Sequence, residues 1–173
     1  CDTDFVGTDG TLGGKFESAR ALADLISAQW PEGRAYRYVV LTGGEPLLQV
    51  DRFLVDALHA AGFEIAVETN GSVKAPEGID WICVSPKAGA DWIQRTGHEL
   101  KLVFPQPGLM PEAVSAVAFD HYLLQPMDGP FQRRNTAAAI AHCQAEPKWR
   151  LSVQTHKTLN IRWHKINCKP ALR

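Results

Sequence analysis

Residues 36–46 read Tyr-Arg-Tyr-Val-Val-Leu-Thr-Gly-Gly-Glu-Pro, an apolar run that ends in a glycine-rich loop. Its β-branched and aromatic first half predicts a buried strand, and the residues after it predict a loop made mostly of backbone. Gly43 and Gly44 let the chain pass close to a ligand and leave its N–H and C=O groups accessible. Pro46 biases Glu45 toward an extended conformation. Because ligands of α/β sheets lie at the carboxyl ends of strands, the loop is a candidate binding site; a plain strand–helix turn is the alternative.

Short apolar stretches recur along the rest of the chain, and each ends in a polar cluster. The predicted strands are 36–41, 63–67, 79–84, 100–104, 122–124 and 150–153, and the predicted helices are 16–30, 50–61, 111–118 and 136–145. Helices between strands indicate a parallel sheet, because parallel neighbours need crossover connections. Two pairs of strands lack an obvious helix between them. The pattern therefore predicts an α/β fold, an incomplete TIM-like barrel of parallel strands with few helices, whose polar clusters share one rim.

Composition narrows the class of protein. The chain has 173 residues, of which 45% are hydrophobic and 21% charged, as expected for one soluble globular domain. No apolar run approaches the roughly 20 residues of a membrane span, and no signal peptide is recognised, so we expect a cytoplasmic protein. The net charge of −1 argues against nucleic-acid binding. Residues 147–173 contain seven Lys or Arg and no Asp or Glu, which indicates either a solvated end or a cationic wall for an anionic small molecule.

Several polar residues at the predicted rim are candidates for ligand binding. Lys87 could pair with a ligand carboxylate or hydroxyl, and a surface lysine is the alternative. Glu68 and Asp128 could accept hydrogen bonds from ribose hydroxyls or an amine, and solvated loop acids are the alternative. His156 could hydrogen-bond a ligand, although a histidine near a chain end is more often inert. Asn70-Gly71 is a strong turn former, so we expect it to be structural.

Other reactive residues show no pattern of their own. The remaining histidines lack ligand spacing, so no zinc site is predicted. Cys83 and Cys143 lie in a predicted strand and a predicted apolar helix, and both are most simply core residues. The sequence contains no nucleophile elbow, Walker loop or dinucleotide fingerprint.

The motifs together carry a resemblance to a known family. The loop 42–46 (TGGEP) resembles the glycine-rich motif of radical S-adenosylmethionine (SAM) enzymes, which cradles the methionyl amine of that cofactor. Residues 1–3 (CDT) resemble the end of those enzymes' three-cysteine cluster motif. The later clusters ETNG, SPK, QPMD and QTHK, which begin at residues 68, 85, 125 and 154, are similar in order and spacing to those of the 7-carboxy-7-deazaguanine synthase family of queuosine and 7-deazapurine biosynthesis. The resemblance spans residues 1 to about 162.

The resemblance implies a radical SAM lyase that converts 6-carboxy-5,6,7,8-tetrahydropterin to 7-carboxy-7-deazaguanine with loss of ammonia. Three cysteine thiolates of such an enzyme hold a [4Fe–4S] cluster and leave one iron open to SAM, and Cys1 resembles the last of the three. A 5′-deoxyadenosyl radical then removes hydrogen from C6 of the pterin. Thr3 would bind a Mg²⁺ ion that also contacts the substrate. The family further implies a flavodoxin-like or other reductant as electron donor and allows a homodimer.

The family's remaining contacts transfer to matching positions of this chain. Substrate binding is expected at Thr42, Glu68 and His156. SAM binding is expected at Cys1, Asp2, Gly44, Ser85, Pro86, Lys87, Gln125, Pro126, Met127 and Asp128.

The sequence also departs from the family pattern. Two of the three cluster cysteines and the first strand would precede Cys1, and they are not part of the sequence. Residues 163–173 look like a non-native or disordered extension, so we expect residues 1–162 to form a radical SAM core that lacks its N-terminal part. The chain as it stands is therefore expected to be inactive. Two alternatives remain: another radical SAM enzyme, such as a glycyl-radical-enzyme activase, or an inactive fragment that keeps only the fold.

Overall fold

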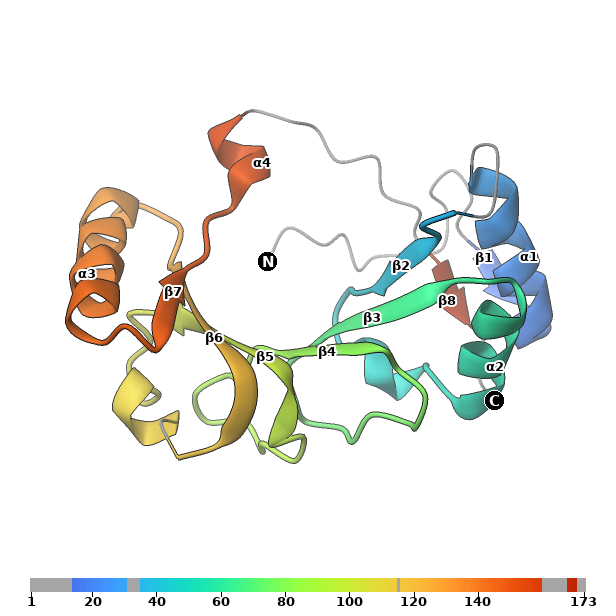
Figure 1. Ribbon diagram of the computed structural model, residues 1–173, viewed down its shortest axis with the longest axis horizontal. Coiled ribbons are helices and arrows are strands. Elements are labelled where there is room, and N and C mark those ends of the chain that lie inside the picture. Colours follow the sequence, from blue (N-terminus) through green and yellow to red (C-terminus); the bar gives the residue numbers. More distant parts are fainter. Residues whose placement is uncertain (1–13, 31–34, 115, 160–167, 171–173) are drawn as a thin grey trace. The chain divides into compact units, whose positions relative to one another are not determined.

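The computed structural model describes residues 14–30, 35–114, 116–159 and 168–170, and Figure 1 shows the elements that they form. Six strands make one sheet in the order β2-β3-β4-β5-β6-β7. Their bounds are β2 Tyr38–Leu41, β3 Glu64–Thr69, β4 Trp81–Val84, β5 Thr96–Phe104, β6 Ala118–Pro126 and β7 Trp149–Leu151. The helices of the described residues are α1 Ala19–Gln29, α2 Arg52–Ala60, α3 Gln132–Ala145 and α4 Thr155–Thr158, with 3-10 turns η1 Pro46–Leu48 and η2 Pro111–Val114. Outside this sheet, β1 (Gly14–Phe16) pairs in parallel with β8 (Cys168–Pro170).

The order of the strands confirms the predicted fold class. Neighbours in the sheet are also neighbours along the chain, and the pairs β2–β3, β4–β5, β5–β6 and β6–β7 are parallel. A sequential order is that of an α/β barrel, whereas the order of a doubly wound sheet reverses part-way. Helix α2 connects β2 to β3, and α3 connects β6 to β7. As predicted, two connections contain no described helix, β3 to β4 and β4 to β5.

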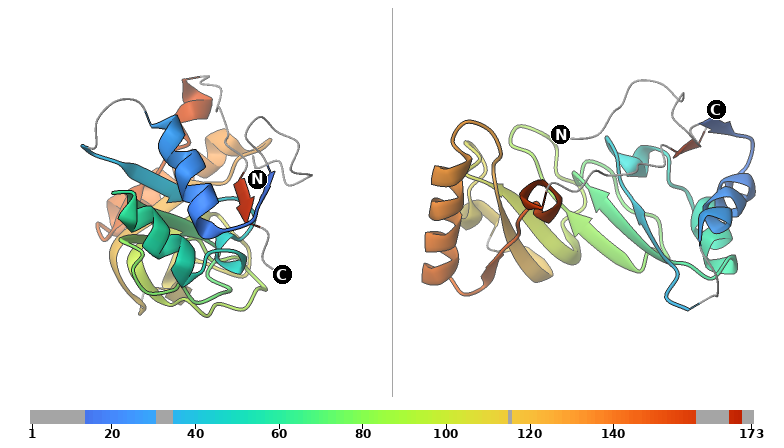
Figure 2. Two further views of the ribbon diagram at one scale, coloured as in Figure 1. Left: turned by 90° about the vertical axis from the view of Figure 1, so that its right-hand side faces the viewer. Right: turned by 90° about the horizontal axis from the view of Figure 1, so that it is seen from above.

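The chain divides into two compact units. Of the described residues, unit 1 contains those within 14–68, 75–81 and 168–170, and unit 2 contains those within 69–74 and 82–159. Within unit 1, α1 and α2 lie side by side (Figure 2). The buried apolar residues of unit 1 include Leu22, Ala23, Leu54, Val55, Leu58, Phe63, Ile65 and Val67.

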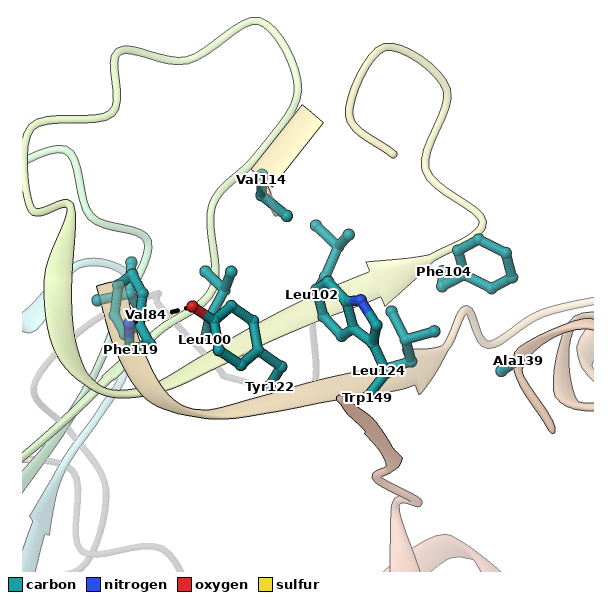
Figure 3. Packing of buried hydrophobic residues seen from close by; sticks show 10 residues of the cluster. All are labelled: Val84, Leu100, Leu102, Phe104, Val114, Phe119, Tyr122, Leu124, Ala139 and Trp149. Carbon is teal, nitrogen blue, oxygen red and sulfur yellow. Dashed lines mark hydrogen bonds between the residues drawn. The ribbon is translucent and has the colours of Figure 1, made fainter. Parts of the chain in front are cut away.

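The core of unit 2 is formed by apolar side chains from β4, β5, β6, β7, α3 and η2 (Figure 3). Tyr122 is central to it, because its ring meets those of Phe119 and Trp149 edge-to-face, with centroids 6.5 and 5.4 Å away. The Tyr122 hydroxyl accepts a hydrogen bond from the Phe119 N–H at 3.2 Å and donates one to the Val117 carbonyl. The one polar atom of this side chain is therefore satisfied inside the core.

Helix α2 illustrates how local sequence sets an element. Asp51 precedes it, and its Oδ1 accepts a hydrogen bond from the Leu54 N–H at 2.9 Å, which caps the helix. The buried residues Leu54 and Leu58 lie four positions apart on one face. Gly62, with φ +83°, follows the helix in the left-handed conformation that glycine adopts without strain. The predicted helix over 50–61 is confirmed.

Other predicted boundaries are wrong in detail. Phe16 belongs to β1 and not to a helix, because Ser18 is extended and its Oγ caps the Ala21 N–H at 3.1 Å. Strands β5 and β6 are both longer than predicted, since their pairing already begins at Thr96 opposite Ala118. The residues after β7, predicted as a strand-end cluster, form the single turn α4.

The proposed boundary between residues 162 and 163 falls outside the described residues, so that division stays a prediction. Within the described part of the chain, no helix has the length and apolar character needed to cross a membrane.

Candidate functional site

The loop after β2 has the backbone geometry that its two glycines predict. Gly43 has φ +145°, and a Cβ built on it would meet no atom of residues 14–30, 35–114, 116–159 or 168–170 within 4 Å. Among these residues, glycine is therefore required here by backbone conformation and not by packing. Glu45 is extended at φ −131° and ψ 103°, as Pro46 predicts, and its Oε1 accepts a hydrogen bond from the Leu47 N–H at 3.0 Å. This bond caps η1 and holds the end of the loop.

Thr42 and Glu68, two residues predicted to bind substrate, lie at adjacent strand ends of unit 1. Leu41 pairs with Val67 in the parallel register of β2 and β3, so Thr42 and Glu68 each follow one residue later. Residues at matching register positions project from the same face of a sheet. Thr42 is exposed and Glu68 is half-buried. A hydroxyl and a carboxylate thus share one face at this end of unit 1.

In unit 2, the loops after β4 and β5 are joined by one side chain that the sequence did not single out. Gln106 accepts a hydrogen bond from the Ala88 N–H at 3.1 Å through Oε1, and its Nε2 donates to the Pro86 carbonyl at 3.4 Å. Pro86 is buried, whereas Lys87 is exposed and its Nζ donates to Ser85 Oγ at 3.0 Å. The Ser85–Lys87 segment is therefore held firmly while its ammonium faces solvent.

The segment that follows β6 is held by its neighbours on the main chain. The Met127 N–H donates to the Phe104 carbonyl at 2.7 Å, and the Met127 carbonyl accepts a hydrogen bond from Asn135 Nδ2 at 2.9 Å. Asp128 Oδ1 accepts a hydrogen bond from the Gly129 N–H at 2.9 Å. Gln125 and Met127 are half-buried, and Asp128 is exposed.

Helix α4 brings a cation to this same segment. Lys157 Nζ forms an ion pair with Asp128 Oδ2 at 2.5 Å. The hydrogen bond from Lys157, together with the one from the Gly129 N–H, holds the pKa of Asp128 below its ordinary value. Asp128 is therefore a carboxylate near neutral pH. His156, the residue before Lys157, is half-buried in α4.

Asn70 and Gly71 have the structural role predicted for them. Asn70 Oδ1 accepts a hydrogen bond from the Ser72 N–H at 2.8 Å, and Gly71 has φ +81°. A Cβ at Gly71 would lie 2.8 Å from both Trp92 and Val84. Close packing and backbone conformation together explain this glycine.

Cys1, Asp2 and Thr3, the candidates for binding the cluster, SAM and magnesium, lie outside the described residues. Cys83 is buried in β4, and Cys143 is half-buried in α3, where burial raises the pKa of its thiol. Both are core residues, as predicted. Within the described ranges, no three His, Cys, Asp or Glu side chains come together in a way that could hold a metal ion.

The structure adds Gln106, Asn135 and Lys157 to the predicted rim residues. Gln106 lies in a predicted strand-end cluster, and Lys157 is next to the predicted His156. The position of each residue at a strand end could therefore have identified it as a candidate. Asn135 lies inside a helix, and no local pattern distinguishes it from a solvent-facing residue.

Comparison with known proteins places the chain among close relatives. No protein-family model matches the sequence. The chain is 65% identical over 162 residues to 7-carboxy-7-deazaguanine synthase of Bradyrhizobium diazoefficiens, an alignment that covers 94% of this chain and 77% of the relative. It is 60% identical to the enzyme of the same name from Caulobacter vibrioides and 59% identical to that from Bordetella pertussis, each over 93% of this chain and 77% of the relative.

A solved structure agrees with these relatives. The crystal structure of QueE from Escherichia coli matches with a TM-score of 0.62 and 26% sequence identity. The match covers 79% of this chain and 63% of that one, so the chain spans less than two thirds of the length of the solved protein.

Proposed function

The chain belongs to the 7-carboxy-7-deazaguanine synthase family, a family of radical SAM lyases, and from this premise we propose the roles of its strand-end loops. They bind SAM and a carboxylated tetrahydropterin, which is converted to 7-carboxy-7-deazaguanine with loss of ammonia. The observation that carries the proposal is the 65% identity over 94% of this chain. Such identity favours the synthase over a glycyl-radical-enzyme activase, which would share the glycine-rich loop alone.

The described loops suit the chemical groups of SAM. No atom of the described residues would crowd a Cβ at Gly43, so within that part of the chain a ligand can approach the backbone of the Gly43–Gly44 loop, whose polar groups would bind the methionyl amine. The exposed ammonium of Lys87 suits the methionyl carboxylate. Asp128, an ionised acceptor, suits the ribose hydroxyls. Gln125, Pro126, Met127, Ser85 and Pro86 would complete the contacts, as would Asp2.

When bound together, a [4Fe–4S] cluster and SAM supply the one-electron chemistry that begins catalysis in such enzymes. Cys1 is the residue of this chain proposed to hold the cluster. Cys83 and Cys143 do not fit that role, because both serve the core and burial raises the pKa of the Cys143 thiol.

The substrate is proposed to bind at Thr42, Glu68 and His156. The Thr42 hydroxyl and the Glu68 carboxylate share a face of the sheet, so together they can hold polar groups on one side of a flat ring. The carboxylate of Glu68 accepts hydrogen bonds and therefore suits the amino and ring N–H groups of a pterin. Thr3 is proposed to place its hydroxyl on a Mg²⁺ ion, since hard cations take oxygen ligands.

Further proposals follow from family membership. A reductant such as a flavodoxin-like protein would supply the electron, and a reducing compartment such as the cytoplasm would suit the cluster. A homodimer is compatible with the family.

The proposal is tested in a chimera, defined as the Bradyrhizobium diazoefficiens relative with its aligned region replaced by that of this chain. The remaining part of the relative, which the alignment does not cover, supplies the rest of the longer protein. After anaerobic reconstitution, the chimera is given SAM, a reductant and 6-carboxy-5,6,7,8-tetrahydropterin, and the product is identified by mass spectrometry. We expect 7-carboxy-7-deazaguanine. A folded chimera that contains iron and cleaves SAM without forming this product would contradict the proposed substrate.

A further inference from the structure

We propose that Asn135 and Lys157 are positioning residues that fix the Met127–Asp128 segment for SAM binding. Neither residue belongs to the segment 125–128 (QPMD), which is proposed to contact SAM. They come from two elements, α3 and α4, and they act on two different groups of the segment, the Met127 carbonyl and the Asp128 carboxylate. The inference rests on the proposed function, because it concerns the SAM site.

Asn135 controls the orientation of the peptide that joins Met127 to Asp128. Its side chain is buried, with 9% of the residue exposed, and its Nδ2 donates to the Met127 carbonyl at 2.9 Å. A buried amide without a hydrogen-bond partner destabilises the fold, and this amide has its partner only while the Met127 carbonyl points toward it. The hydrogen bond therefore favours this conformation of the segment. Helix α3 is itself anchored in the core by the fully buried Ala139. The carbonyl of Met127 is therefore tied to a rigid element.

The other main-chain group of Met127 is also engaged, since its N–H donates to the Phe104 carbonyl at 2.7 Å. With its N–H and its carbonyl both held inside unit 2, the peptide groups on either side of Met127 each have a defined direction. The segment can then present the side chains of the half-buried Met127 and the exposed Asp128 to a ligand in one fixed orientation.

Lys157 controls the direction of the Asp128 carboxylate. One oxygen of Asp128 accepts the Gly129 N–H, and the other pairs with Lys157 Nζ. These two partners leave the carboxylate little freedom to rotate. The side chains of Lys157 and Asp128 are 30% and 45% exposed, and ion pairs at such sites contribute little to folding stability. Lys157 should therefore influence ligand geometry more than stability.

The chain offers a matched control for each residue. Gln94 is a second buried amide, 8% exposed, whose Nε2 donates to the Thr96 carbonyl at 2.7 Å in a loop of unit 2 that holds no proposed contact with SAM. Arg52 forms an ion pair with Asp56 at 3.0 Å in unit 1. The change of amide to carboxylate, N135D or Q94E, keeps the size of the side chain and turns a donor into an acceptor.

The experiment uses the reconstituted chimera. Equilibrium dialysis gives the Kd for SAM, steady-state kinetics gives KM for SAM, KM for the pterin and kcat, and thermal melting gives Tm. We expect N135D and K157A each to raise Kd and KM for SAM by about tenfold, with KM for the pterin unchanged. Q94E is expected to lower Tm as N135D does, but to leave the Kd for SAM unchanged. K157R should retain the parental Kd for SAM, because it keeps a cation opposite Asp128. R52A should change neither the Kd nor the KM for SAM.

The outcomes separate the inference from the proposed function. A parent chimera that does not bind SAM overturns both. A parent that binds SAM, with N135D and K157A showing the parental Kd, overturns the inference alone. The inference is also overturned if Q94E weakens SAM binding as much as N135D does, because the effect then reports general loss of stability.

Discussion

His59 Nε2 lies 2.9 Å from Asp80 Oδ2, and this contact ties the last turn of α2 to the residue before β4. The same oxygen of Asp80 accepts a hydrogen bond from the Ile65 N–H at 2.7 Å, while the Asp80 N–H donates to the Ile65 carbonyl at 3.0 Å. One carboxylate thus joins α2, β3 and the residue that precedes β4. Partial burial opposes ionisation of Asp80, but the hydrogen bonds from His59 and Ile65 outweigh it, and the pKa of Asp80 is lowered.

The lowered pKa of Asp80 predicts a pH-dependent contribution to stability. A carboxyl with a lowered pKa in the folded state stabilises fully above its unfolded pKa of about 3.9, and the contribution disappears as pH falls through the folded pKa. We expect D80N to reduce the free energy of unfolding by about 1 kcal/mol at pH 7, and this deficit to shrink below about pH 4. Urea denaturation at several pH values measures it. A deficit that is constant across this range would contradict the role of the carboxylate.

Gly43 provides a test of backbone conformation separate from packing. G43A places a Cβ on a residue with φ +145°, where no atom of the described residues lies within 4 Å, so we expect backbone strain to be the main cost. We expect a loss of about 1–3 kcal/mol in the free energy of unfolding, or a distorted loop that binds SAM more weakly. G14A is the control, since Gly14 also has open space but no left-handed φ. Equal effects of the two changes on both stability and SAM binding would refute this explanation.

Leu124 tests the core of unit 2. It is fully buried in β6 and belongs to the core cluster of unit 2. We expect L124A to lower the free energy of unfolding by about 2–5 kcal/mol, because it leaves a cavity. L48A removes the same atoms at a position that is 69% exposed, and it should cost no more than about 0.5 kcal/mol. Chemical denaturation compares the two variants, and similar losses would show that burial is not the cause.

The cysteines are predicted to differ in their effect on iron content. In the chimera, C1A removes a proposed cluster ligand, so iron and sulfide per protein should fall sharply after anaerobic reconstitution. C143A should leave both unchanged, because burial raises the pKa of that thiol and leaves little thiolate to bind iron. Colorimetric iron and sulfide assays measure the difference. Loss of iron in C143A with Tm unchanged would show that the assignment of Cys143 to the core is incomplete.

Much of the fold could be predicted because its signals are local. The helix over 52–60 has its cap, its apolar face and its terminal glycine within a dozen consecutive residues. The polar clusters at the ends of strands likewise follow directly from apolar stretches. The predicted boundaries failed where pairing with another strand decided them, as at Thr96, which pairs with Ala118 although its own neighbourhood is polar.

The α/β class, the order of the strand-end loops and the family could be predicted from the amino acids alone, because periodicity, turn residues and motifs are properties of neighbouring residues. Which side chains meet across the connections depends on tertiary packing. Lys157 reaches Asp128 over 29 positions and His59 reaches Asp80 over 21, while Asn135 turns its amide inward to Met127. These contacts depend on strand register and on how α3 and α4 pack after the strands that precede them. Tertiary packing therefore sets them, and no local sequence pattern predicts them.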